Sequence, residues 1–181
     1  MASLRKYFCV CKIFLLPISI AFSNITVSIG DVAVTGYTED IVVPLTVTNT
    51  ENTVGGFQFD VIAVPTLITL SGATPVDAEN FSADYNVFDD GSGRIVFYSN
   101  TENGIAAGGD DVVMNLHYNG SEVLSALVDL EAYDLTVSDE DGTVISGDLV
   151  NGSITIGNVV ILSATSDTGD VLEEVYLDIN L

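Results

Sequence analysis

The stretch Val54-Gly55-Gly56-Phe57-Gln58-Phe59-Asp60-Val61 decides the fold of this chain. Its apolar residues alternate with Gln58 and Asp60, which is the period-2 pattern of a strand with one buried face. Two glycines precede the alternation, where the backbone turns or approaches another segment closely. Phe57 and Phe59 share the apolar face and need an apolar sheet opposite them. We therefore predict that this stretch is the central core strand.

The rest of the chain repeats this kind of pattern. Short alternating apolar runs are separated by Gly, Asn, Asp and Thr, and no run has a long helical period. This spacing is typical of an all-β sandwich or jelly roll. The expected strands cover residues 25–29, 41–48, 54–61, 67–70, 85–88, 94–100, 112–118, 124–137 and 154–156.

Three local features refine this prediction. Pro44 lacks a backbone donor, so the strand over 41–48 should lie at a sheet edge or contain a bulge. In the strand over 124–137, Leu130 and Leu135 are in opposite phases, which requires a bulge or a break near residues 132–134. Residues 71–85 are expected to form a loop, with a helical turn around residues 77–79.

The first 23 residues differ in kind from the rest. Arg5, Lys6 and Lys12 make a basic start, and an apolar run over 13–22 is too short to span a bilayer. Ala21-Phe22-Ser23 supplies small residues for cleavage. We predict a signal peptide over 1–23 and a secreted or cell-surface protein with no membrane insertion after cleavage. The alternative is an N-terminal strand or anchor helix.

Removal of this segment leaves a strongly acidic protein. The remaining chain has 26 Asp and Glu residues against Arg94 alone, a formal charge of −25. A field of this sign repels nucleic acid and anionic membranes, and it favours cations, basic partners or neutral sugars. Solubility in a salty medium explains the charge equally well. Both cysteines lie within the first 23 residues, so the mature chain has no disulfide, no thiolate nucleophile and no cysteine-bound metal.

The C-terminal segment resembles the beginning of the sandwich. Ile156-Gly157-Asn158-Val159 repeats the pattern of Ile29-Gly30-Asp31-Val32, and residues 170–180 resemble residues 40–49. We interpret residues 24–157 as one complete β-sandwich and residues 158–181 as the first strands of a second, truncated repeat.

Several short motifs, taken in order, resemble a cohesin module over residues 24–157. They are Val43-Pro44-Leu45, Asn49, Gly55-Gly56-Phe57-Gln58-Phe59-Asp60-Val61, Pro65 and Asn151-Gly152-Ser153-Ile154-Thr155-Ile156. The chain departs from the family at Ala63-Val64-Pro65, where cohesins usually have Tyr-Asp-Pro. The resemblance implies a nine-stranded antiparallel jelly-roll β-sandwich, related in architecture to a class of carbohydrate-binding modules.

The resemblance also implies a function. Cohesins are non-catalytic modules of extracellular scaffolding proteins, and they hold dockerin-bearing enzymes, often enzymes of polysaccharide degradation. We therefore expect a dockerin-like protein module as the partner. The alternative is a carbohydrate-binding or cell-surface adhesion module, with polysaccharide as the partner and Tyr98 as the best-placed outward ring.

Catalytic and metal chemistry is nearly absent from the sequence. His117 is the only histidine, and neither a nucleophile elbow nor a zinc-binding spacing surrounds it. Asp89-Asp90-Gly91 and Asp139-Glu140-Asp141-Gly142 lack the complete calcium-loop pattern. Solvated turns explain these loops, although they could bind Ca²⁺ weakly. We predict no enzyme activity, no catalytic residue, no metal site and no cofactor.

The candidate partner-binding residues lie on the outward phases of the central strand and of its expected neighbour. An apolar centre with a polar rim is typical of protein interfaces. The alternative is a plain solvent-exposed face with isolated apolar residues. The predicted contact residues are Gln58, Asp60, Ile62, Val96 and Tyr98.

Overall fold

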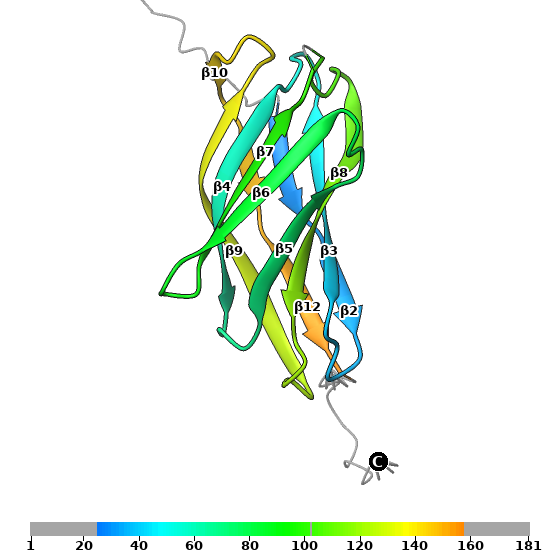
Figure 1. The fold of residues 1–181 in the computed structure, drawn as a ribbon, viewed down its shortest axis with the longest axis vertical. Coiled ribbons are helices and arrows are strands. Elements are labelled where there is room, and N and C mark those ends of the chain that lie inside the picture. The colour runs from blue at the N-terminus through cyan, green and yellow to red at the C-terminus, as the bar shows by residue number, and fades with distance from the viewer. Residues whose placement is uncertain (1–24, 102, 158–181) are drawn as a thin grey trace, which may run out of the picture.

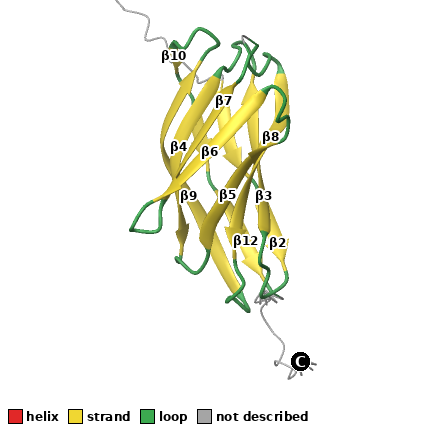
Figure 2. Cartoon of the chain, in the orientation of Figure 1, coloured by secondary structure: helices red, strands yellow, loops and turns green. Residues whose placement is uncertain are grey.

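The computed structural model describes residues 25–101 and 103–157, and within these ranges the chain folds into two stacked β-sheets (Figure 1). Strands and loops account for all of this part, as Figure 2 shows. None of the described segments is a helix long and apolar enough to cross a membrane. The predicted signal peptide over 1–23 and the predicted second repeat over 158–181 lie outside the described residues.

The strands form sheets of five and seven members. The first sheet has the order β11-β1-β3-β8-β5, and the second has the order β2-β12-β9-β4-β7-β6, with β10 paired to β9. In chain order the strands are β1 (Ile25–Ile29), β2 (Asp31–Val34), β3 (Ile41–Asn49), β4 (Gly56–Val64), β5 (Thr69–Pro75), β6 (Phe81–Val87), β7 (Gly93–Ser99), β8 (Gly109–Asn119), β9 (Ala126–Ser138), β10 (Val144–Ile145), β11 (Asp148–Val150) and β12 (Gly152–Ile156).

The number of strands agrees with the expected nine once the sheet crossings are considered. The chain passes from one sheet to the other at Gly30, between β1 and β2, and again at Asn151, between β11 and β12. Nine strands remain when β1 with β2 and β11 with β12 are each counted as one strand and the two-residue β10 is left out. The predicted antiparallel pairing has two exceptions: β1 pairs with β11 in parallel, and β2 pairs with β12 in parallel.

The predicted central strand is confirmed. β4 lies between β9 and β7, and both Phe57 and Phe59 are buried between the sheets. The ring of Phe57 stacks on that of Phe97 at a centroid distance of 4.9 Å, and Phe97 in turn stacks on Phe81 at 5.0 Å. Full burial of one such side chain stabilises the fold by about 1.5–3 kcal/mol. The stacked rings therefore form a major part of the core.

The bulge predicted near residues 132–134 is also confirmed. In the pairing of β4 with β9, Gln58 lies opposite Thr136 and Asp60 lies opposite Tyr133, so β9 has an extra residue in this interval. Asp134 has a φ of 57°, in the left-handed region. The bulge allows Leu130 and Val137 to be buried on the same side of one strand, although their spacing is odd.

Pro44 does not lie in an edge strand, because β3 is flanked by β1 and β8. A bulge is present one residue later, between Leu45 and Thr46. The N–H of Gly30 donates to the carbonyl oxygen of Pro44 at 2.8 Å, at the point where the chain leaves for the other sheet. The proline therefore falls where the neighbouring strand ends. The same bulge turns Val112 outward, with 44% of it exposed, although regular alternation over 112–118 would give it the phase of Met114.

Two further expectations were wrong. Residues 71–85 are not a loop, because they contain most of β5 and β6. These are the last strands of their sheets, so they need few large apolar residues, and the alternation is weak. Within the connection, the N–H of Phe81 donates to the carbonyl oxygen of Asp77 at 3.0 Å, which closes the expected single turn. The second wrong expectation concerns Leu124, which was placed in the strand over 124–137. It is 61% exposed and precedes β9, which begins at Ala126.

Candidate partner-binding face

The structure places all five predicted contact residues on the outer face of the seven-stranded sheet. Gln58, Asp60 and Ile62 lie on β4, and Val96 and Tyr98 lie on β7. Gln58 is directly opposite Val96 in the ladder. Because alternate residues of a strand point to opposite faces, the burial of the phenylalanines directs these side chains outward. Their common location agrees with the sequence analysis, and their role in binding stays a prediction.

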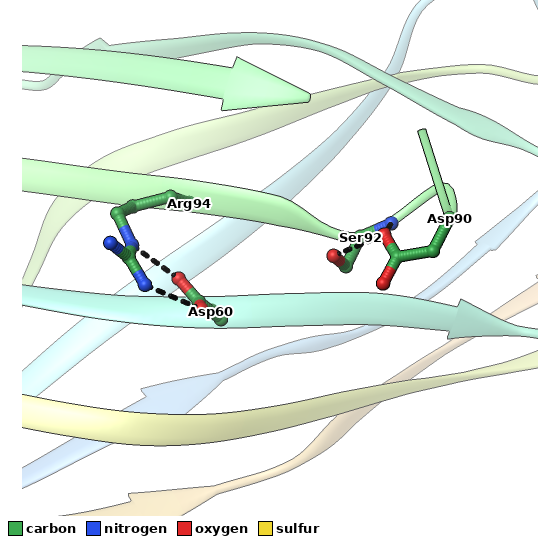
Figure 3. A network of polar contacts seen from close by, with 4 residues as sticks. All are labelled: Asp60, Asp90, Ser92 and Arg94. Atoms are coloured by element: carbon green, nitrogen blue, oxygen red, sulfur yellow. Dashed lines mark hydrogen bonds and ion pairs between the residues drawn. The ribbon is translucent and has the colours of Figure 1, made fainter. Parts of the chain in front are cut away.

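Asp60 is held by an ion pair within the sheet. Its carboxylate accepts two hydrogen bonds from Arg94, from Nε at 2.7 Å and from a terminal nitrogen at 2.8 Å (Figure 3). Only 7% of Asp60 is exposed, whereas Arg94 is exposed and its guanidinium carbon lies 5.7 Å from the ring centre of Phe88. The hydrogen bonds that Arg94 donates to Asp60, together with the negative charge of that carboxylate, raise the pKa of Arg94. Asp60 thus joins β4 to β7 and is a poor direct contact for a partner.

A cleft of about 370 Å³ opens on this face. It lies where β4 begins, between Thr101 and Gly104 on the one hand and the turn over 139–142 on the other. Three of the predicted residues, Gln58, Val96 and Tyr98, line it, whereas Asp60 and Ile62 do not. The lining residues that the sequence analysis did not assign to the binding face include Gly55, Gly56, Thr136, Ser138, Asp139 and Glu140.

Both glycines line this cleft, and neither position has room for a side chain. A Cβ on Gly55 would lie 2.2 Å from the carbonyl oxygen of Asp139, and one on Gly56 would lie 2.7 Å from that of Phe97. The N–H of Gly55 donates to the carbonyl oxygen of Ser138 at 2.9 Å. The turn after β9 is therefore in backbone contact with the start of β4. The glycine pair was the one signal in the sequence for this close approach.

The acidic loops are turns that their own carboxylates stabilise. Oδ1 of Asp139 accepts the N–H groups of Thr143 at 2.7 Å and Asp141 at 3.1 Å. Oδ1 of Asp90 accepts the hydroxyl of Ser92 at 2.6 Å and its N–H at 2.9 Å (Figure 3). The hydrogen bonds from Ser92 lower the pKa of Asp90. Within the described ranges, no three His, Cys, Asp or Glu side chains gather in a group that could hold a metal ion.

His117 lies on the outer face of the other sheet, between the buried Leu116 and Tyr118. Nδ1 is 2.9 Å from Oδ1 of Asp40, and Nε2 is 2.8 Å from the hydroxyl of Thr74. These contacts connect the segment before β3 to β8 and β5. The histidine is thus a cross-strand link, and it is remote from the cleft on the opposite sheet.

The fold matches that of solved cohesins. One is a non-cellulosomal cohesin from the archaeon Archaeoglobus fulgidus, with 20% identity and a TM-score of 0.60 over 75% of this chain and 93% of that one. A second is the type I cohesin of the Coh-OlpA-Doc918 cohesin–dockerin complex from Clostridium thermocellum, with 22% identity and a TM-score of 0.60 over 74% of this chain and 99% of that one. A third is the sixth cohesin of scaffoldin B from Acetivibrio cellulolyticus, in complex with a Cel5 dockerin mutant. It shows 20% identity and a TM-score of 0.58 over 74% of this chain and 99% of that one.

The match is one of fold. No protein-family model matches the sequence, and no curated protein matches it either. The chain has an all-β sandwich with the cohesin architecture, as the motifs around Phe57 and Asn151 indicated.

Proposed function

We propose that this chain, which has the cohesin fold, is a secreted, non-catalytic docking module that holds a dockerin-type partner on the outer face of β9, β4, β7 and β6. The observation that carries the proposal is the cleft lined by Gln58, Val96 and Tyr98 on that face. The matched cohesins from C. thermocellum and A. cellulolyticus were solved in complex with dockerins. We expect a partner of the same class here.

The chemistry of the face supports protein docking. Tyr98 is 42% exposed and Val96 is half-buried, so together they offer an apolar patch at the cleft. Binding energy at interfaces concentrates in aromatic and apolar anchors next to pockets, surrounded by polar residues. Gln58 and Thr136 supply such polar neighbours across the β4–β9 pair.

The biological setting is also part of the proposal. The basic and apolar start of the sequence supports export, and the acidic composition supports an extracellular protein that stays soluble. We propose a scaffolding role in a multi-module protein. One of the matched structures is a non-cellulosomal cohesin, so a link to polysaccharide degradation depends on which enzymes carry the partner module.

The test is a binding measurement with matched variants. We would titrate the purified protein with a panel of dockerin modules, including those from the same genome, by isothermal titration calorimetry. Val96→Asp and Tyr98→Ala should each weaken binding at least tenfold, because loss of an interface anchor typically costs about 2 kcal/mol or more. The control is Val112→Asp, which adds the same charge to an exposed valine on the other sheet and should leave the affinity unchanged.

Two results would contradict the proposal. One is an equal loss of affinity in Val112→Asp, which would show that the loss is not specific to the seven-stranded sheet. The other is an absence of dockerin binding combined with retention on insoluble polysaccharide. That second result would favour the carbohydrate-binding or adhesion alternative, with Tyr98 and Tyr133 as the exposed rings on this face.

A further inference from the structure

The cleft on the seven-stranded sheet is suited to one long side chain. Its volume of about 370 Å³ falls at the lower end of the range for small-ligand sites, about 300–1,000 Å³. Gly55 and Gly56 line it with backbone alone, and the positions of their missing Cβ atoms are filled by the backbone of Asp139 and Phe97. The cleft volume leaves room for one extended side chain from a partner.

The walls of the cleft differ in character. Val96 and Tyr98, on β7, offer apolar contact to an aliphatic stem, and the tyrosine ring also attracts a cation over its face. On the other side, the turn after β9 contributes Asp139 and Glu140. Asp139 is engaged by the N–H groups of its own turn, whereas Glu140 is exposed and makes no hydrogen bond or ion pair within the described part of the chain.

Among the residues that the structure describes, no positive charge competes for these carboxylates. Arg94 is the one Lys or Arg after residue 12, and it is already paired with Asp60. Neither Arg94 nor His117 lines the cleft. The cleft therefore combines apolar contact with an uncompensated negative charge, and it would repel acidic side chains of a partner.

Building on the proposed docking function, we propose that this cleft receives a basic side chain, arginine or lysine, from the partner. The stem would pack against Val96 and Tyr98, and the charged end would reach Glu140. Charge complementarity identifies the occupant: of the ordinary protein side chains, arginine and lysine combine a long aliphatic stem with a permanent positive charge.

The test uses small probes, so it does not depend on having the natural partner. We would titrate the isotopically labelled protein with N-acetyl-arginine methylamide and, separately, with its neutral isostere N-acetyl-citrulline methylamide. Chemical shifts of Gly55, Gly56 and Tyr98 would be followed by NMR. We expect the arginine probe to bind at least fivefold more tightly than the citrulline probe, with the largest shifts at these three residues.

Two matched variants locate the charge. Glu140→Gln should weaken binding of the arginine probe about three- to tenfold and remove most of its advantage over citrulline. Glu131→Gln removes the same charge from β9 on the same face, opposite Ile62 and outside the cleft lining, and should change the affinity less than twofold. Amide spectra of both variants would show that each remains folded.

The inference is overturned if the two probes shift the cleft residues equally in the unmodified protein. It is also overturned if Glu140→Gln and Glu131→Gln reduce binding alike, because general attraction to an acidic surface would then explain the result. Its failure is distinguishable from failure of the docking function. Dockerin binding without any arginine preference would refute the basic-side-chain site alone, whereas arginine binding at the cleft without any dockerin binding would refute the dockerin partner alone.

Discussion

The Asp60 carboxylate shows how a single residue can have the expected position and a different role. Its outward phase was readable from the alternation with Phe59, and the structure places it on the outer face. The bidentate pair with Arg94 then buries it and engages it within the sheet. The sequence held one sign of this pairing, because Arg94 is the only Lys or Arg after residue 12. The cross-strand register that brings the two together depends on the hairpin and could not be fixed beforehand.

Asp90 offers a pH-dependent prediction at the same scale. Hydrogen bonds from Ser92 lower the pKa of the Asp90 carboxyl from its ordinary value of 3.8. A lowered carboxyl pKa stabilises the fold above the unfolded-state pKa, and the contribution disappears as the pH falls through the lower folded-state value. Ser92→Ala removes the hydroxyl bond and should raise the pKa of Asp90 towards 3.8, as measured by NMR titration of the side-chain carboxyl carbon.

The control is within the same titration. Asp77 also has a lowered pKa, which results mainly from the side chain of Asn80, and Ser92→Ala should leave it unchanged. An Asp90 pKa that is the same in the variant and in the unmodified protein would show that the Ser92 hydroxyl has no part in the effect.

At the scale of elements, phase arguments were reliable where strands are buried on one side. The opposite phases of Leu130 and Leu135 correctly required the bulge in β9, because a one-residue slip would expose a whole face. Phase arguments failed for β5 and β6, because strands at the edge of a sheet do not need a regular alternation of apolar and polar residues. They also failed at Val112, since the bulge between Leu45 and Thr46 reverses its orientation and gave no sequence signal apart from the nearby Pro44.

The bulge in β9 makes a prediction about backbone conformation. Asp134 has a φ of 57°, which a β-branched residue adopts at a cost of about 1–2 kcal/mol. Asp134→Val should therefore lower the free energy of unfolding by about that amount. Asp134→Gly and Asp134→Asn tolerate this conformation and should be neutral or stabilising, and Asn also controls for the lost charge. Urea denaturation measures all three, and equal stability of the three variants would contradict the assignment of the bulge.

At the scale of the whole molecule, the prediction of two stacked sheets came from the inward pair Phe57 and Phe59. Both are buried, and Phe97 from β7 extends the stack. The sequence did not reveal the two crossings between sheets at Gly30 and Asn151, which create the parallel pairs. It also did not reveal the cleft, because the turn over 139–142 is brought to β4 by tertiary structure alone.

The core predicts a large effect of one truncation. Phe59→Ala should lower the free energy of unfolding by about 3–5 kcal/mol, the usual cost of removing a buried phenyl ring. Gln58→Ala, the adjacent residue on the outer face, should cost about 0.5 kcal/mol or less. Both values come from urea denaturation followed by circular dichroism. Similar costs for the two variants would mean that Phe59 does not lie between the sheets.

The docking face is tested most directly by methyl NMR of the protein while it is titrated with a dockerin that binds it. The methyl groups of Ile62 and Val96 report on the outer face of the seven-stranded sheet, and those of Val42 and Val112 report on the five-stranded sheet. We predict that the first pair shifts strongly and saturates with the dockerin, while the second pair stays unchanged. Shifts confined to Val42 and Val112 would contradict the proposed face.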